Sequence, residues 1–82
     1  MIDMTRYVRI AWRPVPALSP AIAQDAHVII GDTEFEVSVR PGRRRSLVCT
    51  VNDDAIVARG STMRECKRAV ESIAHNRGTL VQ

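Results

Sequence analysis

Four arginines lie close together in VRPGRRRSLV, residues 39–48, around a Pro-Gly pair. They are Arg40, Arg43, Arg44 and Arg45. Guanidinium groups form paired hydrogen bonds with phosphate oxygens and with guanine edges, and a two-stranded ribbon fits the major groove of DNA. The segment therefore predicts a basic hairpin that contacts nucleic acid. A solvated turn and a surface for an acidic protein are the alternatives.

The other reactive side chains form no catalytic set in the sequence. His27 and His75 are distant from each other, and the adjacent aspartates at 53 and 54 fit a turn. Cys49 and Cys66 lack metal-ligand spacing and fall in apolar patterns, which predicts buried free thiols. P-loop, GxGxxG and HExxH motifs are absent. We therefore expect a protein that is not an enzyme and uses no cofactor or metal.

The length of 82 residues predicts a single domain spanning 1–82, with a frayed tail over 77–82. The net charge of +3 is compatible with a polyanionic partner but does not require one. The sequence contains neither an apolar stretch long enough to cross a bilayer nor the pattern of a signal peptide at its start. We expect a cytoplasmic protein with no membrane partner.

The first half of the chain predicts a strand, a short helix and a hairpin. Residues 5–13 alternate, with Val8, Ile10 and Trp12 on one face and the arginines at 9 and 13 on the other. Ser19-Pro20 favours a short helix over 20–26. Gly31-Asp32 predicts a type II′ turn in a hairpin over 26–40. That turn places one apolar set on a single face, and it consists of Val28, Ile30, Phe35, Val37 and Val39.

The second half predicts two more strands, 46–51 and 55–59, followed by a helix to about His75. Thr62 and Glu65 have the spacing of a capping box. The apolar stripe of the helix consists of Met63, Cys66, Val70, Ile73 and Ala74. The fold class we predict is α+β, with an antiparallel sheet of about four to five strands and one C-terminal helix packed on one face.

The segment IVARGSTMRECKRAVESI, residues 56–73, resembles the end of HicB-type antitoxin domains. Those domains run from three strands into a helix through a pattern like G-D-T-x-x-E-A. Gly60, Thr62 and Glu65 match that pattern, while Ser61 replaces its Asp and Cys66 replaces its Ala. The resemblance implies a sheet-then-helix fold and a role in binding a partner protein.

The leading prediction is a small binding module that engages nucleic acid through the Arg40–Arg45 hairpin. The candidate contact residues are Arg9, Arg13, Arg40, Arg43, Arg44, Arg45 and Arg59. The alternative is a protein-binding inhibitor, either antitoxin-like or a phage-encoded adaptor that blocks a partner enzyme. A homodimer formed by pairing of edge strands is a further prediction.

Overall fold

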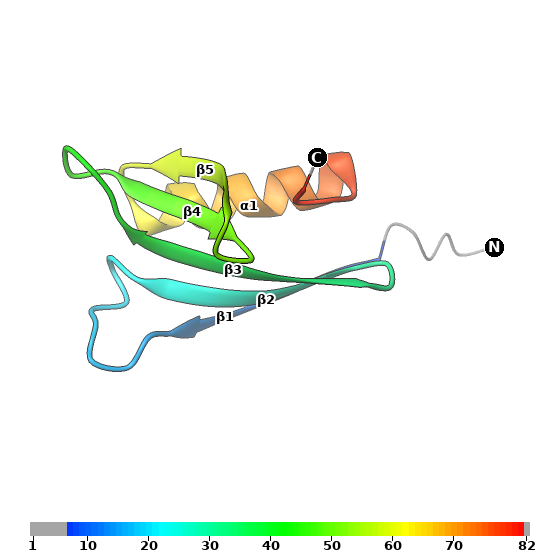
Figure 1. The fold of residues 1–82 in the computed structure, drawn as a ribbon, viewed down its shortest axis with the longest axis horizontal. Helices are drawn as coiled ribbons and strands as arrows, with labels where there is room; N and C mark the ends of the chain where they lie inside the picture. The colour runs from blue at the N-terminus through cyan, green and yellow to red at the C-terminus, as the bar shows by residue number, and fades with distance from the viewer. Residues whose placement is uncertain (1–6, 82) are drawn as a thin grey trace.

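The computed structural model describes residues 7–81 (Figure 1) and contains one sheet and one helix over that range. The elements are β1 (Val8–Pro14), β2 (Gln24–Ile30), β3 (Thr33–Pro41), β4 (Leu47–Val51), β5 (Ala55–Gly60) and α1 (Met63–Arg77). The strands are all antiparallel and lie in the order β1-β2-β3-β4-β5. The predicted α+β fold class is confirmed. The predicted strand over 5–13 begins at Val8, and its first two positions lie outside the described residues.

The β2–β3 hairpin has the predicted turn and register. Gly31 has a φ of 63°, whereas Asp32 is not among the residues with positive φ, as a type II′ turn requires. Val28 pairs with Phe35, and Ile30 pairs with Thr33. The turn chemistry and the hydrophobic pattern therefore select the same register.

The core lies between one face of the sheet and α1, which packs mainly against β5 and β4. Most of it is supplied by small and β-branched side chains, and Phe35 is its one buried aromatic residue among residues 7–81. Its largest fully buried side chains are Val28, Val37, Val39, Cys49, Val51, Cys66 and Val70. The opposite face of the sheet, which we call the open face, carries no helix in the described chain (Figure 1).

Helix α1 begins and ends at the expected kinds of residue. The backbone N–H of Glu65 donates to the Thr62 hydroxyl at 3.2 Å. The Glu65 carboxylate accepts in return from the N–H of Ser61, one residue earlier than in a standard capping box. Gly78 ends the helix with a φ of 71°, and its N–H donates to the carbonyl of Ala74.

The predicted short helix over 20–26 is wrong. Ser19 does accept a hydrogen bond from the N–H of Ala21, but the chain makes only turns at 20–22 and enters β2 at Gln24. Leu18 and Ile22, which would have held such a helix to the sheet, are 46% and 43% exposed. Because β2 pairs along its whole length with β1 and β3, sheet formation outweighs the local helix signal.

The C-terminal tail, for which fraying over 77–82 was predicted, packs against the fold along its described part. Arg77 is still helical, and Leu80 is only 4% exposed because it joins the core. Thr79 also binds the backbone of Val81 through its hydroxyl. An apolar side chain three residues beyond the helix is therefore enough to anchor this end.

A bulge in β5 decides which of its residues reach the open face. Ile56 pairs with Thr50 and Ala58 pairs with Cys49, so Val57 is an extra residue between them. Strict alternation would send Ile56 and Arg59 to opposite faces. The bulge brings both to the open face, where Arg59 lies beside Val48 on β4.

Helix α1 is the one helix among residues 7–81, and it has 15 residues. Its rise of about 22 Å is shorter than the roughly 30 Å hydrocarbon core of a bilayer. Within the described chain, no helix has the length and apolar character needed to cross a membrane.

Candidate nucleic-acid interface

The tip of the β3–β4 hairpin holds two arginines in a backbone conformation that disfavours them. The N–H of Ser46 donates to the carbonyl of Arg43 at 3.0 Å, which closes a tight turn. Arg44 and Arg45, the two central residues, have φ values of 56° and 61°. This is the pattern of a type I′ turn, which favours Asn-Gly because a larger side chain in left-handed backbone costs about 1 kcal/mol or more. The guanidinium groups are thus carried at the extreme end of the hairpin.

A pocket lies on the open face where this tip meets β5. The residues that line it are Gly42, Arg43, Arg44, Ser46, Val48 and Arg59. A Cβ added at Gly42 would lie 2.6 Å from Cγ2 of Val48. The backbone of the hairpin tip can therefore pack this closely against Val48 on β4 only if residue 42 is a glycine. Three arginines line the pocket together with Ser46, and no acidic residue lines it. The Ser46 hydroxyl already donates its hydrogen to the carbonyl of Arg43, so the arginines supply the donors for a ligand. The arrangement can hold a phosphate-like anion.

Arg40, at the base of the hairpin, has its charge compensated within the chain. Its Nη2 lies 2.8 Å from Oδ1 of Asp25, an ion pair by distance although the geometry is not that of a hydrogen bond. Its Nη1 also donates to the carbonyls of Val39 and Gln24. Arg40 therefore ties β3 to β2, unlike the arginines at the tip.

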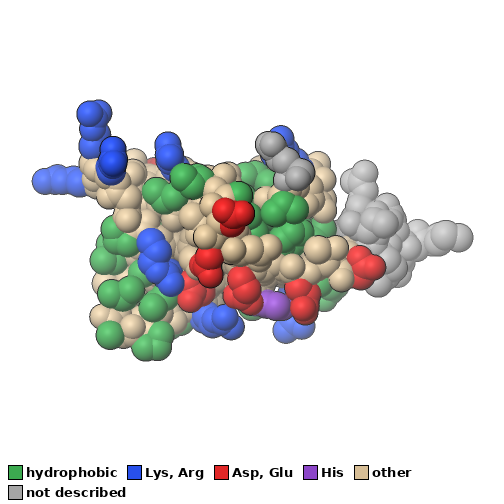
Figure 2. All heavy atoms as spheres, in the orientation of Figure 1, with side chains coloured by type: hydrophobic (Ala, Val, Ile, Leu, Met, Phe, Trp, Pro, Cys, Tyr) green, Lys and Arg blue, Asp and Glu red, His purple; other side chains and the backbone are tan. Residues whose placement is uncertain are grey.

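Arg9 and Arg13 lie on the open face but at the opposite edge of the sheet from Arg59. Glu34 and Glu36 on β3 stand between those two edges, and Arg13 forms an ion pair with Glu36 at 3.4 Å. Figure 2 shows this face, with acidic side chains across its middle and basic side chains projecting at the hairpin end. The basic surface is therefore not continuous across the open face.

His27 lies within this acidic strip. Its two ring nitrogens contact the carboxylates of Glu36 at 2.7 Å and Glu34 at 3.3 Å. These hydrogen bonds raise the pKa of His27 above its ordinary value of 6.5. Both nitrogens face carboxylate oxygens, and no group of His, Cys, Asp and Glu among residues 7–81 is arranged to hold a metal ion. His75 is exposed on α1, a separate element.

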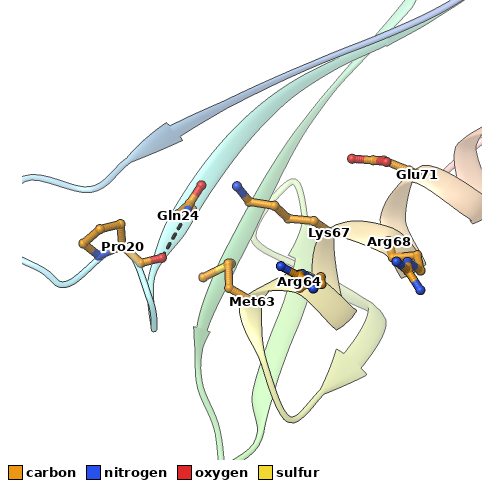
Figure 3. A pocket seen from close by; sticks show the side chains of 7 residues that line it. All are labelled: Pro20, Gln24, Met63, Arg64, Lys67, Arg68 and Glu71. Atoms are coloured by element: carbon orange, nitrogen blue, oxygen red, sulfur yellow. Dashed lines mark hydrogen bonds between the residues drawn. The ribbon is translucent and has the colours of Figure 1, made fainter.

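A second group of cations lines a groove between α1 and the loop that joins β1 to β2. Arg64, Lys67 and Arg68 have i, i+3 and i+4 spacing, so they share one side of the helix. Figure 3 shows Lys67 extending across the groove toward Gln24. The residues that line the groove are Pro20, Gln24, Met63, Arg64, Lys67, Arg68 and Glu71. Glu71, on the third turn of the helix, is the one acidic residue that lines the groove.

The spacing of these helix cations is visible in TMRECKR, residues 62–68, but the facing loop was predicted to be helical, so no groove was predicted. Lys67 is held in place by a contact that the sequence does not reveal. Its Nζ lies 5.3 Å from the centre of the Trp12 ring, a cation–π distance.

The two groups of cations lie at the same end of the fold. The β3–β4 turn, the end of β5 and the start of α1 meet there, because Leu47 pairs with both Pro41 and Gly60. We call this region the basic end, and its residues are Arg43, Arg44, Arg45, Arg59, Arg64, Lys67 and Arg68. Within residues 7–81 none of these side chains forms an ion pair. The basic end therefore carries uncompensated positive charge.

The two cysteines are free and buried, as predicted. The Sγ of Cys66 lies 3.8 Å from the carbonyl oxygen of Leu47 and donates to it. Burial raises the pKa of Cys49 to about 12 and also raises the pKa of Cys66. Thiols in this state are poor nucleophiles, because the reactive species is the thiolate.

Comparison of the chain with family models, with curated proteins and with solved structures finds no match. The resemblance of residues 56–73 to HicB-type antitoxin domains is thus neither supported nor contradicted and stays a prediction.

Proposed function

We propose that the protein is a non-enzymatic binding module whose basic end contacts the phosphate backbone of nucleic acid. Arg43, Arg44 and Arg59 line a pocket that is open to a backbone phosphate, and Arg45 extends the same surface at the tip. The cations on α1 offer further backbone contacts at that end of the fold. Such contacts supply most of the affinity of sequence-independent binding.

The observation that carries the proposal is the left-handed backbone of Arg44 and Arg45. The neighbouring β4–β5 turn also holds two residues with positive φ, but these are Asn52 and Asp53, which tolerate that region well. Arginine at both central positions lowers stability without improving any contact within the described chain. Ala17 in the β1–β2 loop also has a positive φ, of 69°, so strain alone does not single out the tip. At the tip the strain coincides with a cluster of cations that form no ion pair, and strain that persists at such a surface site supports a functional role there.

The basic end suits a duplex better than a single strand. Single-strand binding relies on exposed aromatic rings on which bases stack. The basic end includes no aromatic residue, Phe35 is buried, and the Trp12 ring is covered by Lys67. Tyr7 is 47% exposed, but it lies beside Gly31 in the β2–β3 turn, at the other end of the strands. Contacts of this kind read the backbone and shape of a duplex, with little sequence preference.

The test is binding of the full chain to labelled duplex DNA, duplex RNA and single strands by fluorescence anisotropy at two salt concentrations. The Arg43→Ala/Arg44→Ala/Arg45→Ala variant removes the tip cations. Its matched control is Arg9→Ala/Arg13→Ala/Arg77→Ala, which loses the same net charge away from the basic end. We expect salt-sensitive duplex binding that the tip variant loses and the control retains. Each lost phosphate contact should flatten the log–log salt slope by about 0.9 on duplex DNA.

Two results would overturn the proposal. One is the absence of binding to any nucleic acid at low salt, and the other is an equal loss of affinity in both variants. A salt-insensitive 1:1 complex with a protein would instead favour the inhibitor alternative.

A further inference from the structure

We propose that the free edge of β5 pairs with β5 of a second copy of this chain, which joins the two sheets into one antiparallel sheet. β5 is the last strand in the order and pairs only with β4 among the described residues. Backbone N–H and C=O groups on both sides of the Val57 bulge are therefore open along the outer edge of β5. Such an edge is a template for another strand.

Apolar side chains are exposed along the same edge. Ile56 is 54% exposed, which is the highest value for a large hydrophobic residue among residues 7–81. Val81, which is 42% exposed, lies near it in a groove between β5 and the end of α1. The residues that line this groove are Asp54, Ala55, Ile56, Val57, Ile73, Arg77, Leu80 and Val81. A strand added to β5 would cover part of this apolar surface.

The charges of β5 favour a second copy as the occupant. Asp54 immediately precedes the strand, and Arg59 is its last residue but one. Antiparallel pairing centred on Ile56, with the extra residue Val57 of each copy left out of the ladder, reverses one copy relative to the other. It brings Arg59 of each chain close to Asp54 of the other, so two opposite-charge contacts form by symmetry.

The other free edge of the sheet, β1, has a charge pattern that disfavours pairing with a second copy. Arg9 and Arg13 flank Ala11 on its open face. Self-pairing of β1 about Ala11 would place Arg9 of one chain against Arg13 of the other, and like charges at opposed positions are destabilising. Pro14 also lacks the N–H that a further strand would need. The charge pattern therefore selects β5 over β1.

The test measures the molar mass of the full chain by light scattering, without nucleic acid, from micromolar to near-millimolar concentration. We expect the mass to rise from 9.1 kDa toward twice that value. Arg59→Asp and Asp54→Arg should each weaken the dimer about tenfold or more, because each substitution acts twice in a symmetric interface. The double exchange Asp54→Arg/Arg59→Asp should restore wild-type affinity to within about threefold.

A second pair of variants separates loss of the interface from loss of the fold. Ile56→Asp places a charge on the exposed edge and should give a monomer. Ile22→Asp changes a similarly exposed residue in the β1–β2 loop and should leave the dimer intact. Circular dichroism should show the same secondary structure in both. A wild type that stays at 9.1 kDa, or a dimer unaffected by Arg59→Asp and Ile56→Asp, would overturn the inference.

Discussion

The Nδ1 atom of His27 lies 2.7 Å from Oε1 of Glu36, its direct partner across the β2–β3 ladder. Glu34 contacts the other ring nitrogen, so protonation gives the imidazole two charge-assisted hydrogen bonds and raises its pKa above 6.5. The folded pKa therefore exceeds the unfolded one. The stabilisation is complete below about pH 6.5 and is lost as pH rises through the raised pKa.

We expect this loss to appear as a difference in the unfolding free energy between wild type and His27→Gln. The difference should be larger near about pH 5.5 than near about pH 8.5. Urea denaturation at both pH values measures it, and NMR titration of the imidazole measures the pKa itself. The same comparison with His75→Gln provides the control. An NMR pKa at or below 6.5 would contradict the account.

The turn at the tip of the β3–β4 hairpin predicts a trade between stability and binding. Replacing its two central arginines by the preferred pair, Arg44→Asn/Arg45→Gly, should raise the free energy of unfolding by about 1–2 kcal/mol. The same change should weaken binding to duplex DNA. Thermal or urea denaturation measures the first effect, and anisotropy measures the second.

The control for this prediction is Arg44→Ala/Arg45→Ala, which removes the same charges but keeps a Cβ in left-handed backbone. The stability of this control should stay close to that of wild type. Its binding to duplex DNA should fall as much as that of Arg44→Asn/Arg45→Gly. If both double variants were equally stable, strain would not explain the conformation of the turn.

Gly60, the last residue of β5, packs against the first turn of α1. A Cβ at this position would lie 2.9 Å from Cβ of Glu65 and 3.2 Å from Sγ of Cys66. Neither neighbour is the far end of a flexible side chain, so Gly60→Ala should lower stability by about 1–3 kcal/mol. Ser61→Ala, at the exposed next position, should change stability by less than about 0.5 kcal/mol. Urea denaturation distinguishes the two variants.

The thiols should react only after the fold opens. Cys49 and Cys66 are both fully buried, and the pKa of Cys49 is raised to about 12. We expect Ellman's reagent to label the native chain much more slowly than the chain in urea. An Ala11→Cys variant, with its new thiol on the exposed side of β1, should add one rapidly reacting group. Rapid labelling of both natural thiols in native wild type would contradict their burial.

Local signals in the sequence determined most of the elements. Alternating apolar residues identified the strands, and Gly31-Asp32 set the register that pairs Val28 with Phe35. Thr62 and Glu65 marked the start of the helix. These features depend on the side-chain period of a strand and on turn or capping contacts within a few residues, so no distant partner is needed to specify them.

Only the tertiary structure decided where the charges meet. The bulge at Val57 brings Arg59 to the open face, and the strand order places acidic β3 side chains between Arg59 and the arginines of β1. Sheet pairing also replaced the local helix signal at 20–26, which opened the groove beside α1. Each outcome depends on segments far apart in the chain. The Arg40–Arg45 cluster was visible in the sequence, whereas the basic end that contains its tip exists only once the sheet and helix have packed.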